Sequence, residues 1–222
     1  MKELPEASSG ATGVMLRLGR GLAIGYEKQI AEVPDELVLG MGTHFLLARN
    51  GRGKTTLLKT VSGLLKRLGG EYAVGGRCCF VADDLAFDRE LPARLIFAAF
   101  LDKAGRAAAA ELADKVELDV KKPFGKLSFG NRKKVGVVVA ECGRRHGDVV
   151  LYDEPFTGLD TPAREALLAR WEETCGEVTR LVSCHPDLDE MAMPSALLIS
   201  DGKIGRPGDG AASWAELKRL LK

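Results

Sequence analysis

Two hydrophobic patterns alternate along the chain from residue 43 onward. Short apolar runs are typical of strands inside a mainly parallel sheet, and they occupy residues 43–48, 77–83, 149–152 and 178–186. Helical patterning is found at 55–68, 92–104, 106–118, 131–142, 161–176 and 213–222. Because strands and helices alternate, the pattern predicts an α/β domain with a mainly parallel core sheet.

The remaining segments complete this domain. Residues 14–30 alternate loosely between apolar and polar around three glycines, which predicts an N-terminal subdomain of short antiparallel strands. Residues 196–205 are typical of a hairpin. We expect residues 84–147 to form a short helical subdomain inserted within a single domain that spans 1–222.

Helix boundaries are also marked in the sequence. The two glycines at 69–70 are expected to stop the first helix, and Pro92 suits the first turn of the second. Thr161 is predicted as an N-cap with Pro162 at the first helical position. Ser213 is predicted to cap the closing helix.

The charge balance limits the expected partners. The chain has 222 residues, of which 32 are basic and 31 acidic, and a formal net charge of +1. This balance leaves no electrostatic footprint for nucleic acid, so we expect no nucleic-acid partner. The short basic runs at 121–122 and 132–134 are interpreted as solvated faces.

The cysteines and the apolar runs indicate a cytoplasmic location. The cysteines lack the C-x-x-C spacing of a zinc site and are interpreted as reduced thiols of a cytosolic protein. They are Cys78, Cys79, Cys142, Cys175 and Cys184. No apolar run approaches the roughly 20 residues that cross a bilayer, and the first ten residues do not resemble a signal peptide. Any membrane role is therefore expected to come through a partner.

A glycine-rich loop joins the strand at 43–48 to the following helix. Its sequence from Ala48, ARNGRGKTT, matches the phosphate-binding pattern G-x-x-x-x-G-K-[ST] except that Ala48 replaces the first glycine. Backbone N–H groups in such a loop converge on a phosphate at a helix N-terminus, where the helix dipole favours negative charge. Alanine at this position is excluded only if the residue needs a positive φ or a bare α-carbon. The alternative is a glycine-rich helix start that binds no ligand.

Each polar or glycine position of this loop has an expected role. Gly51 and Gly53 allow the backbone to turn tightly and to approach a phosphate. Lys54 would reach the β- and γ-phosphates of a nucleotide, and the Thr55 hydroxyl would bind Mg²⁺.

A second stretch, VVLYDEP at 149–155, predicts a buried strand that ends in two carboxylates. Because side chains alternate along a strand, Asp153 and Glu154 face differently and can take different roles. One would lie near Mg²⁺, and the other would orient and deprotonate an attacking water. Acidic residues are also common in ordinary loops, so this stretch does not decide the function by itself.

The two stretches together resemble the Walker A and Walker B elements of P-loop ATPases, and further stretches narrow the family. KLSFGNRKK is similar to the LSGGQ signature of the ATP-binding cassette (ABC) ATPases at Leu127, Ser128 and Gly130. EPFTGLD is similar to a D-loop that ends at Asp160, and LVSCHP places His185 as the switch histidine. These motifs follow the family's order.

The resemblance covers residues 14–205 and implies a fold and a ligand. The fold is the P-loop NTPase fold of an ABC ATPase, which binds ATP with Mg²⁺ between two subunits arranged head to tail, as a homodimer or a heterodimer. Tyr26 stands where the family's A-loop aromatic stacks on adenine. The nucleotide-binding residues that the resemblance implies are Tyr26, Asn50, Gly51, Arg52, Gly53, Lys54, Thr55, Thr56, Ser128, Gly130 and Asp160.

The resemblance also implies catalytic residues and metal ligands. The catalytic residues are Glu154 as general base, His185, Lys54 and Asp83, and the metal ligands are Thr55, Asp83 and Asp153.

Besides Ala48, four positions depart from the family's pattern. Asp83 replaces the Q-loop glutamine, and at about 4 Å its charge would repel a γ-phosphate by roughly 1–4 kcal/mol. Phe129 and Asn131 replace a small residue and the glutamine of the signature. Arg52 lies inside the glycine-rich loop, and we expect its side chain to be in solvent.

Three functions remain in competition. The leading hypothesis is an ATP-hydrolysing subunit, peripheral on the cytoplasmic face of a membrane, that drives a separate transmembrane permease subunit. The apolar stretch at 91–101 would then expose side chains for docking. The alternatives are a soluble ABC ATPase in complex assembly and a weakly hydrolysing scaffold that is switched by nucleotide.

Overall fold

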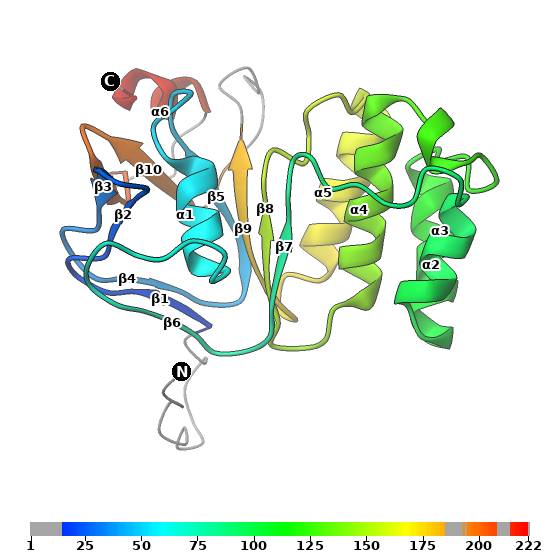
Figure 1. Cartoon of the computed structure of the whole chain (residues 1–222), viewed down its shortest axis with the longest axis horizontal. Coiled ribbons are helices and arrows are strands. Elements are labelled where there is room, and N and C mark those ends of the chain that lie inside the picture. The colour runs from blue at the N-terminus through cyan, green and yellow to red at the C-terminus, as the bar shows by residue number, and fades with distance from the viewer. Residues whose placement is uncertain (1–14, 185–192, 194, 208–213, 222) are drawn as a thin grey trace.

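The main sheet forms the centre of the protein. The computed structural model describes residues 15–184, 193, 195–207 and 214–221, and within them the main sheet has eight strands (Figure 1). In spatial order these are β2 (Ala23–Gly25), β3 (Gln29–Glu32), β11 (Lys203–Gly205), β10 (Ala196–Ser200), β5 (Gly42–Leu47), β9 (Thr179–Cys184), β8 (Val149–Tyr152) and β7 (Cys78–Val81). The neighbours from β10 to β7 pair in parallel, which confirms the predicted α/β class.

A second sheet of three antiparallel strands lies at the N-terminal side of the described chain. Its order is β4 (Leu37–Leu39), β1 (Leu16–Leu18) and β6 (Tyr72–Val74). With the antiparallel hairpin β2–β3 it forms the antiparallel region predicted near the N-terminus. β4 and β6 were not predicted, because three-residue strands are too short to show a clear alternation of apolar and polar positions.

Helices cover both faces of the main sheet. They are α1 (Lys54–Val61), α2 (Ala93–Phe100), α3 (Lys103–Lys115), α4 (Phe129–Gly143), α5 (Thr161–Glu173) and α6 (Trp214–Leu220), with a 3₁₀ turn at Phe124–Lys126. Figure 1 shows α1 between the two sheets, and α4 and α5 on the side of β7 and β8. Within the described ranges, no helix combines the length and the apolar character that a bilayer crossing requires.

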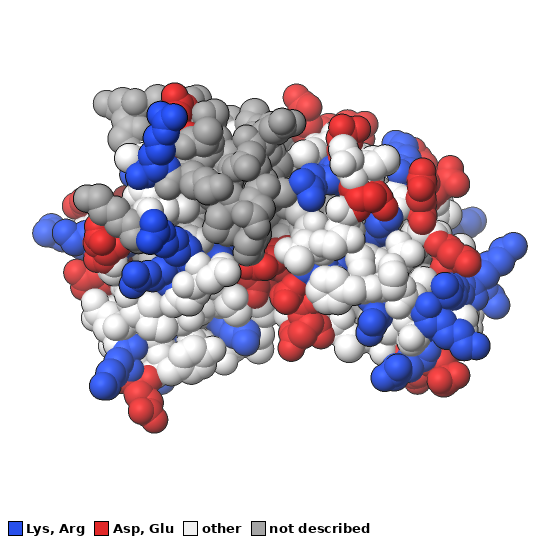
Figure 2. Space-filling view, turned by 90° about the horizontal axis from the view of Figure 1, so that it is seen from above, with Lys and Arg blue, Asp and Glu red and all other residues white. Residues whose placement is uncertain are grey.

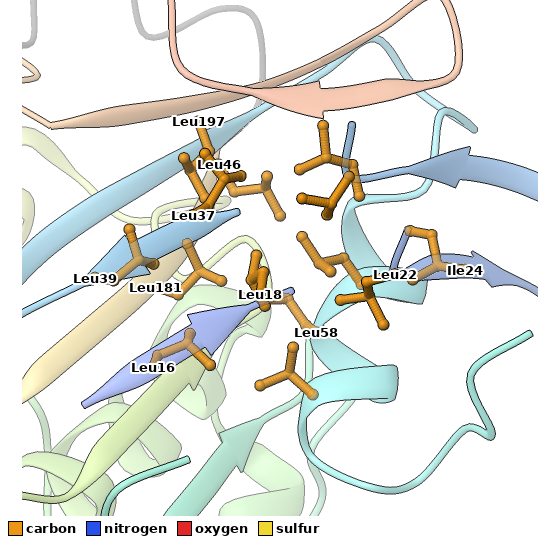
Figure 3. Packing of buried hydrophobic residues seen from close by; sticks show 14 of the residues in the cluster. Leu16, Leu18, Leu22, Ile24, Leu37, Leu39, Leu46, Leu58, Leu181 and Leu197 are labelled. Carbon is orange, nitrogen blue, oxygen red and sulfur yellow. The ribbon is translucent and has the colours of Figure 1, made fainter. Parts of the chain in front are cut away.

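The alternation of side chains along the central strands creates two cores. Leu46 of β5 packs with the residues of α1 and the three-stranded sheet, whereas Phe45 and Leu47 pack with α4, α5 and α6. Figure 3 shows Leu46, Leu181 and Leu197 meeting Leu18 and leucines of the smaller sheet. Burying one such side chain contributes about 1.5–3 kcal/mol. The two cores thus fix β5 from both sides and hold its carboxyl end in place.

The segment predicted as a helical insert has an apolar cluster of its own. α2 and α3 pack against α4 around a core that includes Ala93, Phe97, Leu112 and Val135. Figure 1 places these helices beyond the edge strand β7.

The first helix is shorter than predicted. α1 ends at Val61 rather than near 68, because Gly63 adopts a positive φ of 78° and turns the chain away. The Leu68 N–H then donates to the Ala23 carbonyl at 2.8 Å. Leu64 and Leu68, which suggested a longer helical period, are both exposed.

The boundary between the two insert helices also differs from the prediction. The chain leaves α2 at Leu101, and Asp102 starts α3, whereas the sequence predicted a first helix to 104 and a second from 106. The Asp102 carboxylate accepts the Gly105 N–H at 2.7 Å and so caps α3.

The N-cap of α5 was assigned one residue too late. Asp160, not Thr161, is the N-cap, and its Oδ1 accepts the Ala163 N–H at 2.9 Å. The negative charge of an aspartate at this position also interacts favourably with the positive end of the helix dipole. Ser213, the predicted cap of the closing helix, lies outside the described residues.

A charged pair is buried between α4 and β9. The side chains of Glu141 and Arg180 are fully buried, and the Arg180 guanidinium donates to both Glu141 oxygens at 2.9 and 2.8 Å. Tyr152 and Trp171 donate to the same carboxylate at 2.5 and 2.8 Å, and Arg144 donates at 3.0 Å. The network ties the two helices α4 and α5 to strands β8 and β9.

Candidate active site

The glycine-rich loop has the backbone shape that the sequence predicted. β5 ends at Leu47 and α1 begins at Lys54, with Gly51 and Gly53 at φ values of 75° and 108°. The φ at position 53 favours glycine, and a Cβ there would in addition lie only 3.2 Å from the Ile30 side chain.

Ala48 fits the loop without strain. Among the described residues, positive φ at a residue other than glycine occurs at Glu117, Glu154 and Asp201, and so not at Ala48. The residue is fully buried at the end of the strand. A positive φ, which would exclude alanine, is therefore not required at position 48.

The start of α1 suits an anion. No side chain caps this helix, so its first-turn N–H groups lack a partner from a capping residue. The Lys54 side chain is only 6 % exposed, and its Nζ lies 3.4 Å from the Ala48 carbonyl and 3.5 Å from Glu154 Oε1. Such long contacts leave a buried ammonium with capacity for a closer anionic partner. This arrangement fits a nucleotide phosphate.

The two carboxylates after β8 have different surroundings. Asp153 is buried, and its Oδ1 accepts the Ser183 hydroxyl at 2.8 Å. Ser183 in turn accepts the Glu154 N–H at 2.9 Å, which links the end of β8 to the neighbouring strand β9. The Glu154 side chain remains one-quarter exposed and faces Lys54. The predicted division of the two carboxylates is therefore present in the geometry.

Glu154 has an unusual backbone conformation. Its φ of 49° lies in the left-handed region, which is uncommon for residues other than glycine and asparagine. The Lys133 ammonium donates to the Glu154 carbonyl at 2.7 Å, and the Thr157 N–H donates to it at 3.2 Å. Strained residues of this kind persist where neighbours hold them, and they are frequent at functional sites.

The predicted signature segment begins α4. Ser128 is exposed and is the N-cap of α4, where its Oγ accepts the Asn131 N–H at 3.2 Å. Gly130 packs against the Gly158 carbonyl so closely that a Cβ at 130 would lie 2.1 Å from that oxygen. Phe129 is half-exposed beside them. Glycine at 130 is thus required by contact with the chain's own predicted D-loop.

Comparison with known proteins decides the family. No family model matches the chain. The chain is 30 % identical to an ABC transporter ATP-binding protein of Streptomyces coelicolor, over 91 % of this chain and 80 % of that protein. The chain belongs to the ATP-binding subunits of ABC transporters. It is also 30 % identical to the zinc import ATP-binding protein ZnuC of Halorhodospira halophila, over 82 % of this chain and 72 % of that protein.

The fold agrees with this family. The structure of an ATP-binding subunit of an ABC transporter matches with a TM-score of 0.78 and 23 % identity, and covers 93 % of this chain and 99 % of that chain. The resemblance stated from the motifs is thus confirmed for the family and for the fold. It is the fold that brings the ends of β5, β8 and β9 together, because carboxyl ends of parallel strands meet at one edge.

The other residues that the motifs assigned to the site differ in exposure. Tyr26 is 60 % exposed in the turn between β2 and β3, and Ile24 and Ile30 on either side of that turn face Gly53. Asn50 and Arg52 are exposed on the loop, as expected for Arg52, and Thr55 is half-buried. Thr56 is buried. His185 falls outside the described residues, directly after the end of β9.

Asp83 and Asp160 each pair with a lysine of the same chain. Asp83 is half-exposed after β7, and Lys133 forms an ion pair with it. Asp160 caps α5 and meets the Lys134 ammonium at 3.1 Å. The hydrogen bond from the Ala163 N–H, followed by the one from Lys134, lowers the pKa of Asp160 below its usual value.

The interpretation of the basic run at 132–134 as a solvated face holds for Arg132, which is exposed, and was wrong for the two lysines. The side chains of Lys133 and Lys134 are 7 % and 4 % exposed. Lys134 donates to the Val116 carbonyl at 2.7 Å, so each ammonium is satisfied by oxygens inside the fold. Charge alone does not indicate which face of a helix is covered by loops that are distant in sequence.

Sequence reasoning missed three residues that support the site: Ser183, Lys133 and Lys134. Ser183 could have been found, because it is a polar residue near the carboxyl end of the strand beside the predicted Walker B strand. The lysines gave no comparable signal, since their partners lie on loops far away in the chain.

Proposed function

We propose that the chain binds ATP with Mg²⁺ and hydrolyses it, as the subunit that powers transport through a separate membrane-spanning partner. The observation that carries the proposal is the meeting of Lys54 and Glu154 at 3.5 Å across the edge of the sheet. The Lys54 ammonium is buried and can bind a phosphate, and the Glu154 carboxylate beside it is partly exposed to water. Membership of the ABC family supports the same reading.

The phosphates are held by the loop and the start of α1. Backbone N–H groups from Asn50 to Thr56 and the Lys54 ammonium surround them, and Tyr26 stacks on the adenine. Thr55, Asp83 and Asp153 are the residues that would hold Mg²⁺, which usually takes only one or two carboxylates from protein. Bound Mg²⁺ neutralises phosphate charge.

Glu154 acts as the general base. Its side chain accepts a proton from the attacking water, and its main chain is fixed by hydrogen bonds with Ser183 and Lys133. His185 lies outside the described residues and follows Cys184, the last residue of β9, in the sequence; in this proposal it contacts the γ-phosphate. Fixing the base in advance reduces the reorganisation that the reaction requires.

A second ABC subunit completes the site. In a head-to-tail pair, Ser128 and the Gly130 N–H of one subunit close on the γ-phosphate held by the other, and Asp160 lies near the contact. The exposed position of Ser128 at the start of a helix supports this arrangement. Figure 2 views the molecule from the end toward which β9 points, where acidic and basic side chains are interspersed over the described surface.

The permease is proposed to dock on α2. Leu91, Leu95 and Phe100 are exposed, and Phe100 is 63 % exposed, as expected for an apolar docking surface in this stretch. The similarity to a zinc import ATP-binding protein supports a role in transport. Docking there would hold this chain at the cytoplasmic face of the membrane.

A photo-crosslinking amino acid in place of Leu95 tests the docking surface. After irradiation in membranes of the source cells, we expect an adduct with a multi-span membrane protein, identified by mass spectrometry, because an apolar docked helix would lie within reach. The same group in place of the exposed Leu64, which follows α1, is the matched control and should give little of this adduct. Equal yields from both positions, or adducts with soluble proteins alone, would argue against a permease at α2.

A further inference from the structure

Lys133 holds a central position among the loops of the site. Its ammonium forms an ion pair with Asp83, donates to the Glu154 carbonyl at 2.7 Å and lies 5.0 Å from the centre of the Phe129 ring. The side chain is 7 % exposed although it carries a charge. A buried ammonium is tolerated when oxygens and an aromatic face replace water in this way.

These contacts connect two of the positions that depart from the ABC pattern. Asp83 stands in place of the Q-loop glutamine, and Phe129 stands in place of a small signature residue. Lys133 touches both. The extra negative charge at 83 is therefore accompanied by a positive charge fixed beside it.

The pair includes one proposed metal ligand, Asp83, and lies next to another, Asp153. Asp83, Lys133 and Asp153 line the same small cavity, together with Pro155. A divalent cation bound near Asp153 would compete with the Lys133 ammonium for the Asp83 carboxylate. Because opposite charges at close range attract each other strongly in a partly buried site, the lysine reduces what Asp83 contributes to metal binding.

We propose that Lys133 is the counter-ion of Asp83 and thereby sets the metal affinity of the nucleotide site, an inference that rests on the proposed function. The Glu154 carbonyl and the Phe129 ring fix the ammonium in place, so its charge acts at a defined position. Lys133 is a positioning residue and does not itself bind nucleotide or metal.

The test compares metal affinity in variants of the full chain bound to ADP. Mn²⁺ replaces Mg²⁺, and free Mn²⁺ is followed by electron paramagnetic resonance during a titration. Lys133→Gln removes the charge and keeps a donor for the Glu154 carbonyl. It is expected to raise Mn²⁺ affinity about threefold or more, since the Asp83 carboxylate becomes available to the metal.

A second set of variants assigns the effect to Asp83. In Asp83→Asn/Lys133→Gln the gain should disappear, and Lys133→Arg should behave as the wild type because the charge is kept. Lys122→Gln, at an exposed lysine, is the control for loss of a positive charge elsewhere. Asp83→Asn alone is the reference for the double variant, because Lys133→Gln should add no Mn²⁺ affinity once the Asp83 carboxylate is absent.

The outcomes distinguish a failure of the proposed role of Lys133 from a failure of the proposed ATP-binding function. Unchanged affinity in Lys133→Gln, or a gain that persists in the double variant, overturns the role of Lys133 while the wild type still binds Mn²⁺ and ADP. A wild type without ADP binding overturns the proposed function and this inference together.

Discussion

Replacing Glu154 with glutamine is expected to lower the rate of ATP hydrolysis by roughly two to four orders of magnitude. Glutamine keeps the shape of the side chain but does not accept the proton of the attacking water. Lys54, 3.5 Å from this side chain, and the Ser183 hydrogen bond to the main chain should remain in place, so ATP is still bound. Phosphate release under single-turnover conditions measures the effect.

A matched control shows whether the loss belongs to this carboxylate. Glu165→Gln changes an exposed glutamate of α5 and should leave the rate within about twofold of the wild type. Equal and slow rates for wild type and Glu154→Gln would rule out Glu154 as the base and favour the nucleotide-switched scaffold.

The same variant should reveal the second subunit. If hydrolysis normally opens the pair, ATP-bound Glu154→Gln should accumulate as a dimer in light scattering. Ser128→Arg places a large charged side chain at an exposed helix start and should keep that protein monomeric. A monomer in both proteins at saturating ATP would be inconsistent with the head-to-tail arrangement.

Replacing Glu141 with glutamine is expected to cost about 3–5 kcal/mol of the free energy of unfolding. The substitution leaves the fully buried guanidinium of Arg180 without its charged partner, and Arg144 loses part of its own. Urea unfolding followed by circular dichroism measures the change. The control is Glu111→Gln, which removes an exposed ion pair with Lys115 and should cost less than about 1 kcal/mol.

The pH dependence of stability provides a second readout of this pair. Burial alone would raise the pKa of Glu141, but the hydrogen bonds and charge of Arg180 outweigh it and hold the pKa below its usual 4.5. The contribution is therefore present above pH 4.5 and is lost as the pH falls further toward the folded value. Glu141→Gln should lack this acid-dependent loss. A free energy of unfolding within about 1 kcal/mol of the wild type would show that the pair is dispensable.

Features that depend on local sequence were predicted well. The loop at Gly51 and Gly53 needs two positive φ values, which glycine supplies by itself. The different surroundings of Asp153 and Glu154 were also expected, although the left-handed backbone of Glu154, just beyond the end of β8, was not. These rules act over a few residues, so the sequence displays them directly.

Features that depend on distant partners were not predicted. Glu141 and Arg180 are 39 residues apart, and nothing in either segment indicates the other. Lys133 and Lys134 appeared as one basic run, yet each ammonium is buried against a different loop. α1 ended early at Val61 because Gly63 and the pairing of Leu68 with β2 outweighed the helical period.

Binding of an ATP phosphate by Lys54 and the glycine-rich loop is tested most directly by calorimetric titration of the purified chain with ATP in the presence of Mg²⁺. We predict saturable binding by the wild type, and a loss of at least about tenfold in affinity in Lys54→Ala, since a buried charge-assisted contact is removed. Lys66→Ala, at an exposed lysine after α1, should bind as the wild type does. Absence of binding by the wild type, or equal affinity in Lys54→Ala, would contradict the account.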